Sequence, residues 1–123
     1  MASLNKAALQ FIVQDVVKTA EYYRDILGFT IHGYFLDPPV HAMVARDNVE
    51  IHFGKSDGPE IKTNKMFRKI SVDAYIWTDD IDKLFEELKN CKANIIEDIT
   101  KRIYGSREFV IEDCNGYTIA FGD

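Results

Sequence analysis

The chain has 123 residues, a net charge of −5 and a hydrophobic fraction of 46%, values that fit one folded domain of ordinary size. The acidic balance argues against a nucleic-acid surface, which needs clustered Lys and Arg to meet phosphates. No window of roughly 18 apolar residues is present, and residues 1–15 lack the basic and apolar regions of a signal peptide, so we predict a cytoplasmic protein without nucleic-acid or membrane partners.

The first half of the chain alternates between strand-like and helix-like patterns. Residues 8–15 are rich in β-formers and end in a polar stop, which predicts a strand. Residues 16–27 follow with apolar side chains at helical spacing, and Gly28 stands where a C-terminal cap belongs. Asp47 and Asn48 suit a two-residue hairpin turn. Three further strand-like runs occupy residues 29–35, 40–45 and 49–54.

The second half repeats this order. Residues 70–78 predict a strand, and residues 79–91 predict a helix with one apolar face, formed by Ile81, Leu84, Phe85 and Leu88. Asp15 and Asp80 precede the two helices, and each half ends in Phe-Gly. Three more strands are predicted at residues 93–98, 106–113 and 116–122.

A β-α-β-β-β unit that occurs twice predicts an α+β fold within a single domain, residues 1–123. We place module one at about residues 5–54, a polar and basic linker at about 55–69, and module two at about 70–123. Each helix has one apolar face and is expected to cover one side of its own curved sheet. The other side of the sheets is then free to form a cleft.

The order and two motifs resemble the vicinal oxygen chelate superfamily, which includes glyoxalase I, extradiol dioxygenases and bleomycin-resistance proteins. The opening "VQDVVKTAEYYRDILGF" is similar to the strand-Asp-helix-Leu-Gly-Phe opening of that family, and "YGSREFVIEDCNGYTIAF" is similar to the closing motif of its bleomycin-resistance-like branch. Cys114, Tyr104 and Tyr117 stand where the family usually has Pro, Trp and Asn. The resemblance implies two tandem βαβββ modules around a cleft.

The resemblance also implies where a metal would be held. Metal-using members draw one ligand from each of four strands, and these positions match Ala8, Glu50, Asp73 and Ala120. A methyl group cannot donate to a metal, so two of the four ligands are missing. We therefore predict no metal and no other cofactor. An off-pattern cluster remains as an alternative, formed by His41, His52 and Glu50 with Asp73 or Glu108.

Strand parity predicts which side chains face the cleft, because residues two apart on a strand point to the same side. A two-residue turn at 47–48 places Met43 opposite His52, with His41 diagonal to it. The predicted ligand-binding residues are Gln10, Phe35, His41, Met43, Glu50, His52, Asp73, Tyr75, Trp77, Tyr104, Glu108 and Val110. No catalytic residue is assigned.

Three functions fit these features. The first, implied by the resemblance, is a metal-free homodimer with two equivalent grooves that sequesters a small cationic or aromatic molecule. Aromatic side chains would stack on the ligand, and Glu50, Asp73 and Glu108 would attract positive charge. The second is a lyase, isomerase or dioxygenase with the off-pattern metal site. The third is a metal-free enzyme with Glu50 or His52 as general base. A simpler alternative involves no ligand: Glu50 and His52 lie on a solvated sheet face, and the aromatic residues form a dimer interface.

Overall fold

In the computed structural model, which describes residues 1–123, the chain divides into two compact units. The first unit comprises residues 1–24 and 28–61 and contains nearly all of module one, and the second comprises residues 25–27 and 62–123 and contains module two. The division after residue 61 falls within the segment 55–69 that the sequence predicts as a linker. No helix has the length and apolar character needed to cross a bilayer.

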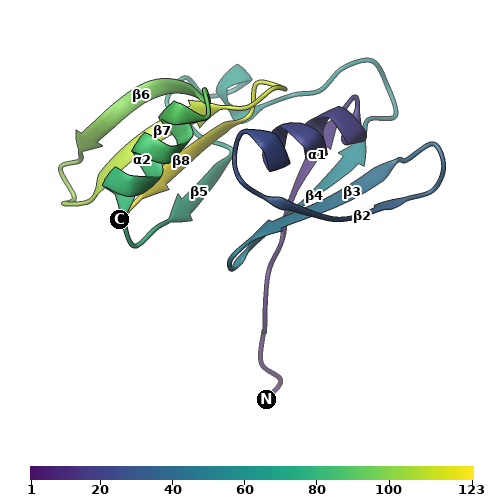
Figure 1. The fold of residues 1–123 in the computed structure, drawn as a ribbon, viewed down its shortest axis with the longest axis horizontal. Coiled ribbons are helices and arrows are strands. Elements are labelled where there is room, and N and C mark those ends of the chain that lie inside the picture. The colour runs from purple at the N-terminus through teal and green to yellow at the C-terminus, as the bar shows by residue number, and fades with distance from the viewer. The chain divides into compact units, whose positions relative to one another are not determined.

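Module one is a four-stranded sheet with one helix on its face (Figure 1). The strands lie in the order β1-β4-β3-β2, with β1 parallel to β4 and the other neighbours antiparallel. The elements are β1 (Leu9–Val13), α1 (Val16–Asp25), β2 (Thr30–Phe35), β3 (His41–Arg46) and β4 (Val49–Lys55).

Module two repeats this arrangement with the strand order β5-β8-β7-β6, and β5 is parallel to β8 (Figure 1). The α+β prediction with two β-α-β-β-β modules is therefore confirmed. A single 3-10 turn precedes the repeat. The elements are η1 (Asn64–Met66), β5 (Ala74–Trp77), α2 (Ile81–Asn90), β6 (Asn94–Lys101), β7 (Arg107–Glu112) and β8 (Thr118–Gly122).

Both helices start in the same way, because an aspartate satisfies a backbone N–H that the first turn leaves without a helical partner. The amide of Lys18 donates to Asp15 Oδ1, and the amide of Lys83 donates to Asp80 Oδ1, each at 3.0 Å. At the other end of α1, Gly28 adopts φ 76°, a conformation that glycine takes without strain.

Aromatic side chains fill the space between each helix and its sheet. In module one, Tyr23 of α1 packs on Phe53 of β4, with ring centroids 4.8 Å apart, and both side chains are fully buried. In module two, Phe85 of α2 meets the buried Phe109 of β7 edge-on at 5.2 Å, and Phe109 stacks on Phe121 of β8 at 5.1 Å. Burial of these rings holds each helix on one face of its sheet. The opposite face of each sheet is called its open face.

Strand alternation follows the predicted parity on β1 and β4 but not in module two, where all of β8 and the four central residues of β7 are buried. On β1, Phe11 and Val13 are buried while Gln10 and Ile12 are exposed, and on β4 Ile51 and Phe53 are buried between half-buried neighbours. The hairpin prediction is also confirmed, since Arg46 pairs with Val49 across the two-residue turn.

Element ends differ from the predictions at three places. Helix α1 ends at Asp25, before the predicted cap. Strand β5 begins at Ala74 rather than at residue 70, because the preceding residues form a turn in which Ser71 Oγ donates to the Arg68 carbonyl. Strand β6 extends to Lys101, because it pairs with β7 through two irregularities that a regular alternation does not predict.

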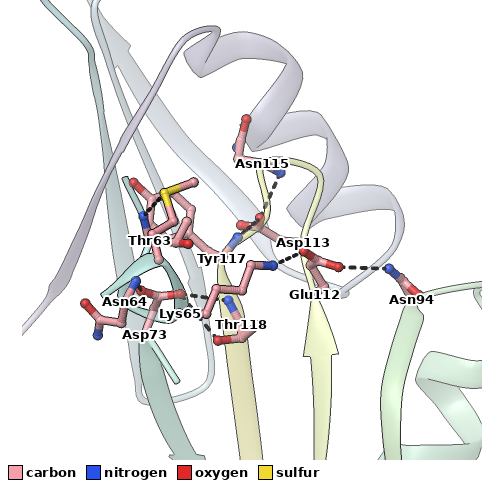
Figure 2. Close-up of polar contacts among 11 residues, drawn as sticks. Thr63, Asn64, Lys65, Asp73, Asn94, Glu112, Asp113, Asn115, Tyr117 and Thr118 are labelled. Atoms are coloured by element: carbon pink, nitrogen blue, oxygen red, sulfur yellow. Dashed lines mark hydrogen bonds and ion pairs between the residues drawn. The ribbon is translucent and has the colours of Figure 1, made fainter. Parts of the chain in front are cut away.

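The closing motif contains the turn between β7 and β8, which a buried carboxylate holds together (Figure 2). Asp113 Oδ1 accepts the amides of Asn115 at 2.8 Å and Tyr117 at 2.9 Å. Gly116 adopts φ 91°, which a residue with a side chain rarely tolerates. The turn therefore has a structural role, which is to position the start of β8.

Candidate functional site

The open faces of the two sheets carry equivalent positions. Gln10 of β1 pairs with His52 of β4, two residues before Gly54, and Tyr75 of β5 pairs with Ala120 of β8, two residues before Gly122. The Phe-Gly pair that ends each half thus sets a common register.

On module one, the face carries a linked group of charged and imidazole side chains. His52 Nε2 lies 2.7 Å from Glu50 Oε2, and Lys6 Nζ donates to Glu50 Oε1 at 2.9 Å. An ionised carboxylate only accepts, so His52 donates in this contact. The ring of His41 meets that of His52 edge-on, with centroids 5.4 Å apart. The hydrogen bond from Lys6, followed by that from His52, lowers the pKa of the Glu50 carboxyl.

The structure brings two further predicted residues of module one near this group and places a third at its margin. Met43 pairs with His52 across the hairpin, as the predicted turn requires. Gln10 pairs with His52 from the other side. Phe35 lies at the end of β2 opposite His41 and is 59% exposed. A carboxylate that holds an imidazole in place can orient it as a general base. Here the ionised Glu50 is shared between His52 and an ion pair with Lys6.

On module two, aromatic rings dominate the open face. Tyr75 and Trp77 lie next to each other on β5, with ring centroids 4.7 Å apart and planes tilted by 50°. Trp77 is 71% exposed and Tyr104 is 68% exposed. Val110, also predicted for the face, is buried. The result is an exposed aromatic surface of a kind that soluble proteins present at binding sites and interfaces.

A buried carboxylate, Glu108, lies beneath this aromatic surface. Tyr75 Oη donates to Glu108 Oε1 at 2.8 Å, the hydroxyl of Tyr104 donates to the same oxygen, and Arg102 Nε donates to Oε2 at 3.1 Å. Burial raises the pKa of Glu108, but the two hydroxyls and the guanidinium outweigh it and hold the pKa below its ordinary value. Glu108 is therefore ionised at neutral pH.

Arg102 is a member of this group that the sequence patterns did not single out. It lies in the turn between β6 and β7, and its guanidinium bridges Glu108 and the half-exposed Glu97. The one sequence feature that could have indicated Arg102 is its position at the start of the β6–β7 turn. It directly follows Lys101, which forms the last pair of the hairpin with Arg107. The positive charge of Arg102 makes Glu108 a weaker attractor of cations than the sequence suggests.

The family relationship is established by sequence. Residues 4–121 match the model of the Glyoxalase/Bleomycin resistance protein/Dioxygenase superfamily. The chain belongs to this superfamily. No curated protein sequence is significantly similar to the chain.

Solved structures of this superfamily's fold match nearly the whole chain. TioX from Micromonospora sp. ML1 gives a TM-score of 0.77 at 14% identity, covering 96% of this chain and 97% of that one. A glyoxalase-related enzyme from Clostridium phytofermentans gives 0.77 at 21% identity, covering 98% and 95%. A glyoxalase/bleomycin resistance protein/dioxygenase from Alicyclobacillus acidocaldarius gives 0.75 at 16% identity, covering 96% and 89%. At such identities the likeness concerns the fold and not the activity.

The residues at the superfamily's metal positions do not fit a metal. Ala8 and Ala120 offer no donor atom. The register also shows that the module-one counterpart of Ala120 is His52 and not Glu50. Ala120 pairs with Tyr75 on β5, and His52 pairs with Gln10, which has the same position on β1. No group of three or more His, Cys, Asp or Glu side chains is placed so that it could hold a metal ion.

Asp73, the third of these positions, ties together three segments of module two (Figure 2). Its Oδ1 accepts the amide of Asn64 at 2.8 Å, and its Oδ2 accepts the amide of Thr118 at 2.9 Å. These bonds fix η1 against β5 and β8, and they occupy both carboxylate oxygens. The geometry favours a structural role for Asp73.

Changing Asp73 to Asn should therefore lower the free energy of unfolding by about 1 kcal/mol, because one of the two acceptor oxygens becomes an amide donor. Urea denaturation of both proteins measures this difference. Asp79→Asn, a change at an exposed aspartate nearby, is the matched control and should have little effect. Equal stability of Asp73→Asn and the wild type would argue against the structural role.

An open pocket of about 530 Å³ lies elsewhere in module two, along the segment between η1 and β5. None of the residues predicted for ligand binding lines it. Its lining residues are Asn64, Phe67, Arg68, Ser71 and Val72. The exposed rings, the buried carboxylate and the linked hydroxyls converge on the open sheet face instead, so that face is the stronger candidate site.

Proposed function

We propose that the protein binds a small planar organic molecule on the open face of module two and carries out no chemical step on it. The observation that carries the proposal is the exposure of Trp77, 71% open to solvent, beside the ring of Tyr75 and above an ionised carboxylate. A planar ligand stacked on these rings would shield their exposed apolar faces from water. A homodimer that acts in this way is in keeping with the bleomycin-resistance-like branch.

Charge supports an aromatic ligand more than a small hydrophilic cation. Each carboxylate predicted to attract positive charge is already engaged: Glu50 by Lys6 and His52, Glu108 by Arg102, and Asp73 by the backbone amides of Asn64 and Thr118. The faces of Trp and Tyr rings still attract a cation through their quadrupoles. The proposed ligand class is therefore aromatic molecules, both neutral and cationic. The metal-dependent alternative has no donor geometry in its favour.

Fluorescence tests the proposal directly, because Trp77 is the only tryptophan in the chain. We expect a planar tricyclic probe, either neutral acridine or N-methylacridinium, to quench this fluorescence saturably with one site per chain. Calorimetry with the same probes gives an independent measure of stoichiometry. If neither probe causes saturable quenching or measurable heat, the face is an ordinary solvated sheet surface and the proposal is wrong.

A further inference from the structure

The contact between Tyr75 and Glu108 depends on a glycine. Tyr75 is on β5 and Glu108 on β7, so the phenol must cross β8, which lies between them in the sheet (Figure 1). It crosses at Gly122, which pairs with both Trp77 and Glu108. A Cβ atom at Gly122 would lie 2.7 Å from Tyr75 Cζ and closer still to its hydroxyl oxygen. Only glycine leaves room for the ring there.

The equivalent glycine of module one makes no such contact. A Cβ atom at Gly54 would lie 3.4 Å from Gln10 Nε2 and 3.4 Å from Ile12 Cδ1, which is ordinary van der Waals distance. Gly122 is thus specific to the arrangement of module two. Tyr75, Gly122 and Glu108 are called the tyrosine lock below.

In the tyrosine lock, both oxygens of Glu108 already accept hydrogen bonds. One oxygen accepts two phenol hydroxyls, the other accepts Arg102, and the residue as a whole is 5% exposed. Burial, together with the nearby Glu108 charge, raises the pKa of Tyr75, so its hydroxyl stays protonated and continues to donate. A molecule on this face meets the rings of Tyr75 and Trp77, and the carboxylate beneath them is buried and hydrogen-bonded at both oxygens.

We propose that the tyrosine lock makes this face select planar aromatic ligands without N–H donors, either neutral or N-alkylated cations, over equally flat cations that carry N–H donors. The inference rests on the proposed function and names its ligand class. A donor N–H that leaves water for this face finds both Glu108 oxygens buried and already hydrogen-bonded, which weakens binding. An alkylated cation has no such requirement and is attracted by the ring faces.

Three flat tricyclic probes separate these chemistries at mildly alkaline pH. Acridine is neutral, N-methylacridinium is a cation without donors, and 9-aminoacridine is a cation with N–H donors. For the wild type we expect N-methylacridinium to bind about tenfold more tightly than 9-aminoacridine, the effect of one unsatisfied donor. Calorimetric titration gives both dissociation constants.

The variant Tyr75→Phe keeps the ring but frees one acceptor position on Glu108. It should therefore reduce the preference for N-methylacridinium by about tenfold. Tyr34→Phe, at a half-exposed tyrosine of β2 in module one, is the matched control and should leave the ratio unchanged. A wild type that prefers 9-aminoacridine, or a ratio that Tyr75→Phe does not alter, overturns this inference alone. Failure of all three probes to bind overturns the proposed function and this inference with it.

Discussion

Replacing Trp77 by alanine should weaken binding of N-methylacridinium by about 1–3 kcal/mol, the usual loss when an aromatic anchor is removed from a binding site. The ring of Trp77 is exposed and packs only against Tyr75 among the aromatic residues, so its removal should leave the core of module two intact. Calorimetry is the suitable measurement, because the variant has no tryptophan to report on. Chemical denaturation should show nearly unchanged stability.

Phe67→Ala is the control for this prediction. Phe67 is as exposed as Trp77, at 74% against 71%, but it lies beside η1 and not on the open sheet face. Its removal should leave the affinity unchanged. Light scattering of both variants distinguishes a ligand surface from a dimer interface: if Trp77→Ala dissociates a dimer without changing the affinity per chain, the aromatic surface serves association and not ligand binding.

The sequence was sufficient to predict the parts of the fold that local rules control. Alternation on β4 separates Ile51 and Phe53 from Glu50 and His52, because strand residues point to opposite faces in turn. The two-residue turn then fixes the hairpin register, which places Met43 opposite His52. The resulting contact between the rings of His41 and His52 follows from these two rules alone.

Contacts made outside regular elements could not be predicted in this way. Lys6 precedes β1, and no periodicity indicates that it pairs with Glu50, 44 residues later. Asp73 precedes β5, and its bonds to Asn64 and Thr118 depend on how the chain turns before the strand begins. Parity could place both carboxylates on the open face, but it could not show that other groups already occupy them.

The tyrosine lock shows the same limit at the level of one glycine. The sequence shows that both halves end in Phe-Gly, and this suggests that Gly54 and Gly122 are equivalent. They differ only because Tyr75 is long enough to cross β8, whereas Gln10 occupies the matching position of β1. The distinction depends on a side-chain path across three strands, which a one-dimensional pattern does not contain.

Changing Gly122 to alanine should lower the free energy of unfolding by about 1–3 kcal/mol, the range for forcing an extra carbon into a packed site. The sign makes this test decisive, because alanine in place of glycine within a strand normally stabilises by roughly 0.5–1 kcal/mol. Here the new methyl group would displace the Tyr75 ring and break its bond to Glu108. Urea denaturation measures the change.

A double-mutant cycle assigns this loss to the tyrosine lock. In a Tyr75→Ala background the methyl group meets no ring, so Gly122→Ala should become neutral or slightly stabilising, with a coupling of about 1–3 kcal/mol between the two sites. Gly54→Ala is the matched control in module one, where the methyl group fits at 3.4 Å from its neighbours, and it should not destabilise. Equal destabilisation by Gly122→Ala in both backgrounds would mean that Gly122 has a backbone role and does not serve to admit Tyr75.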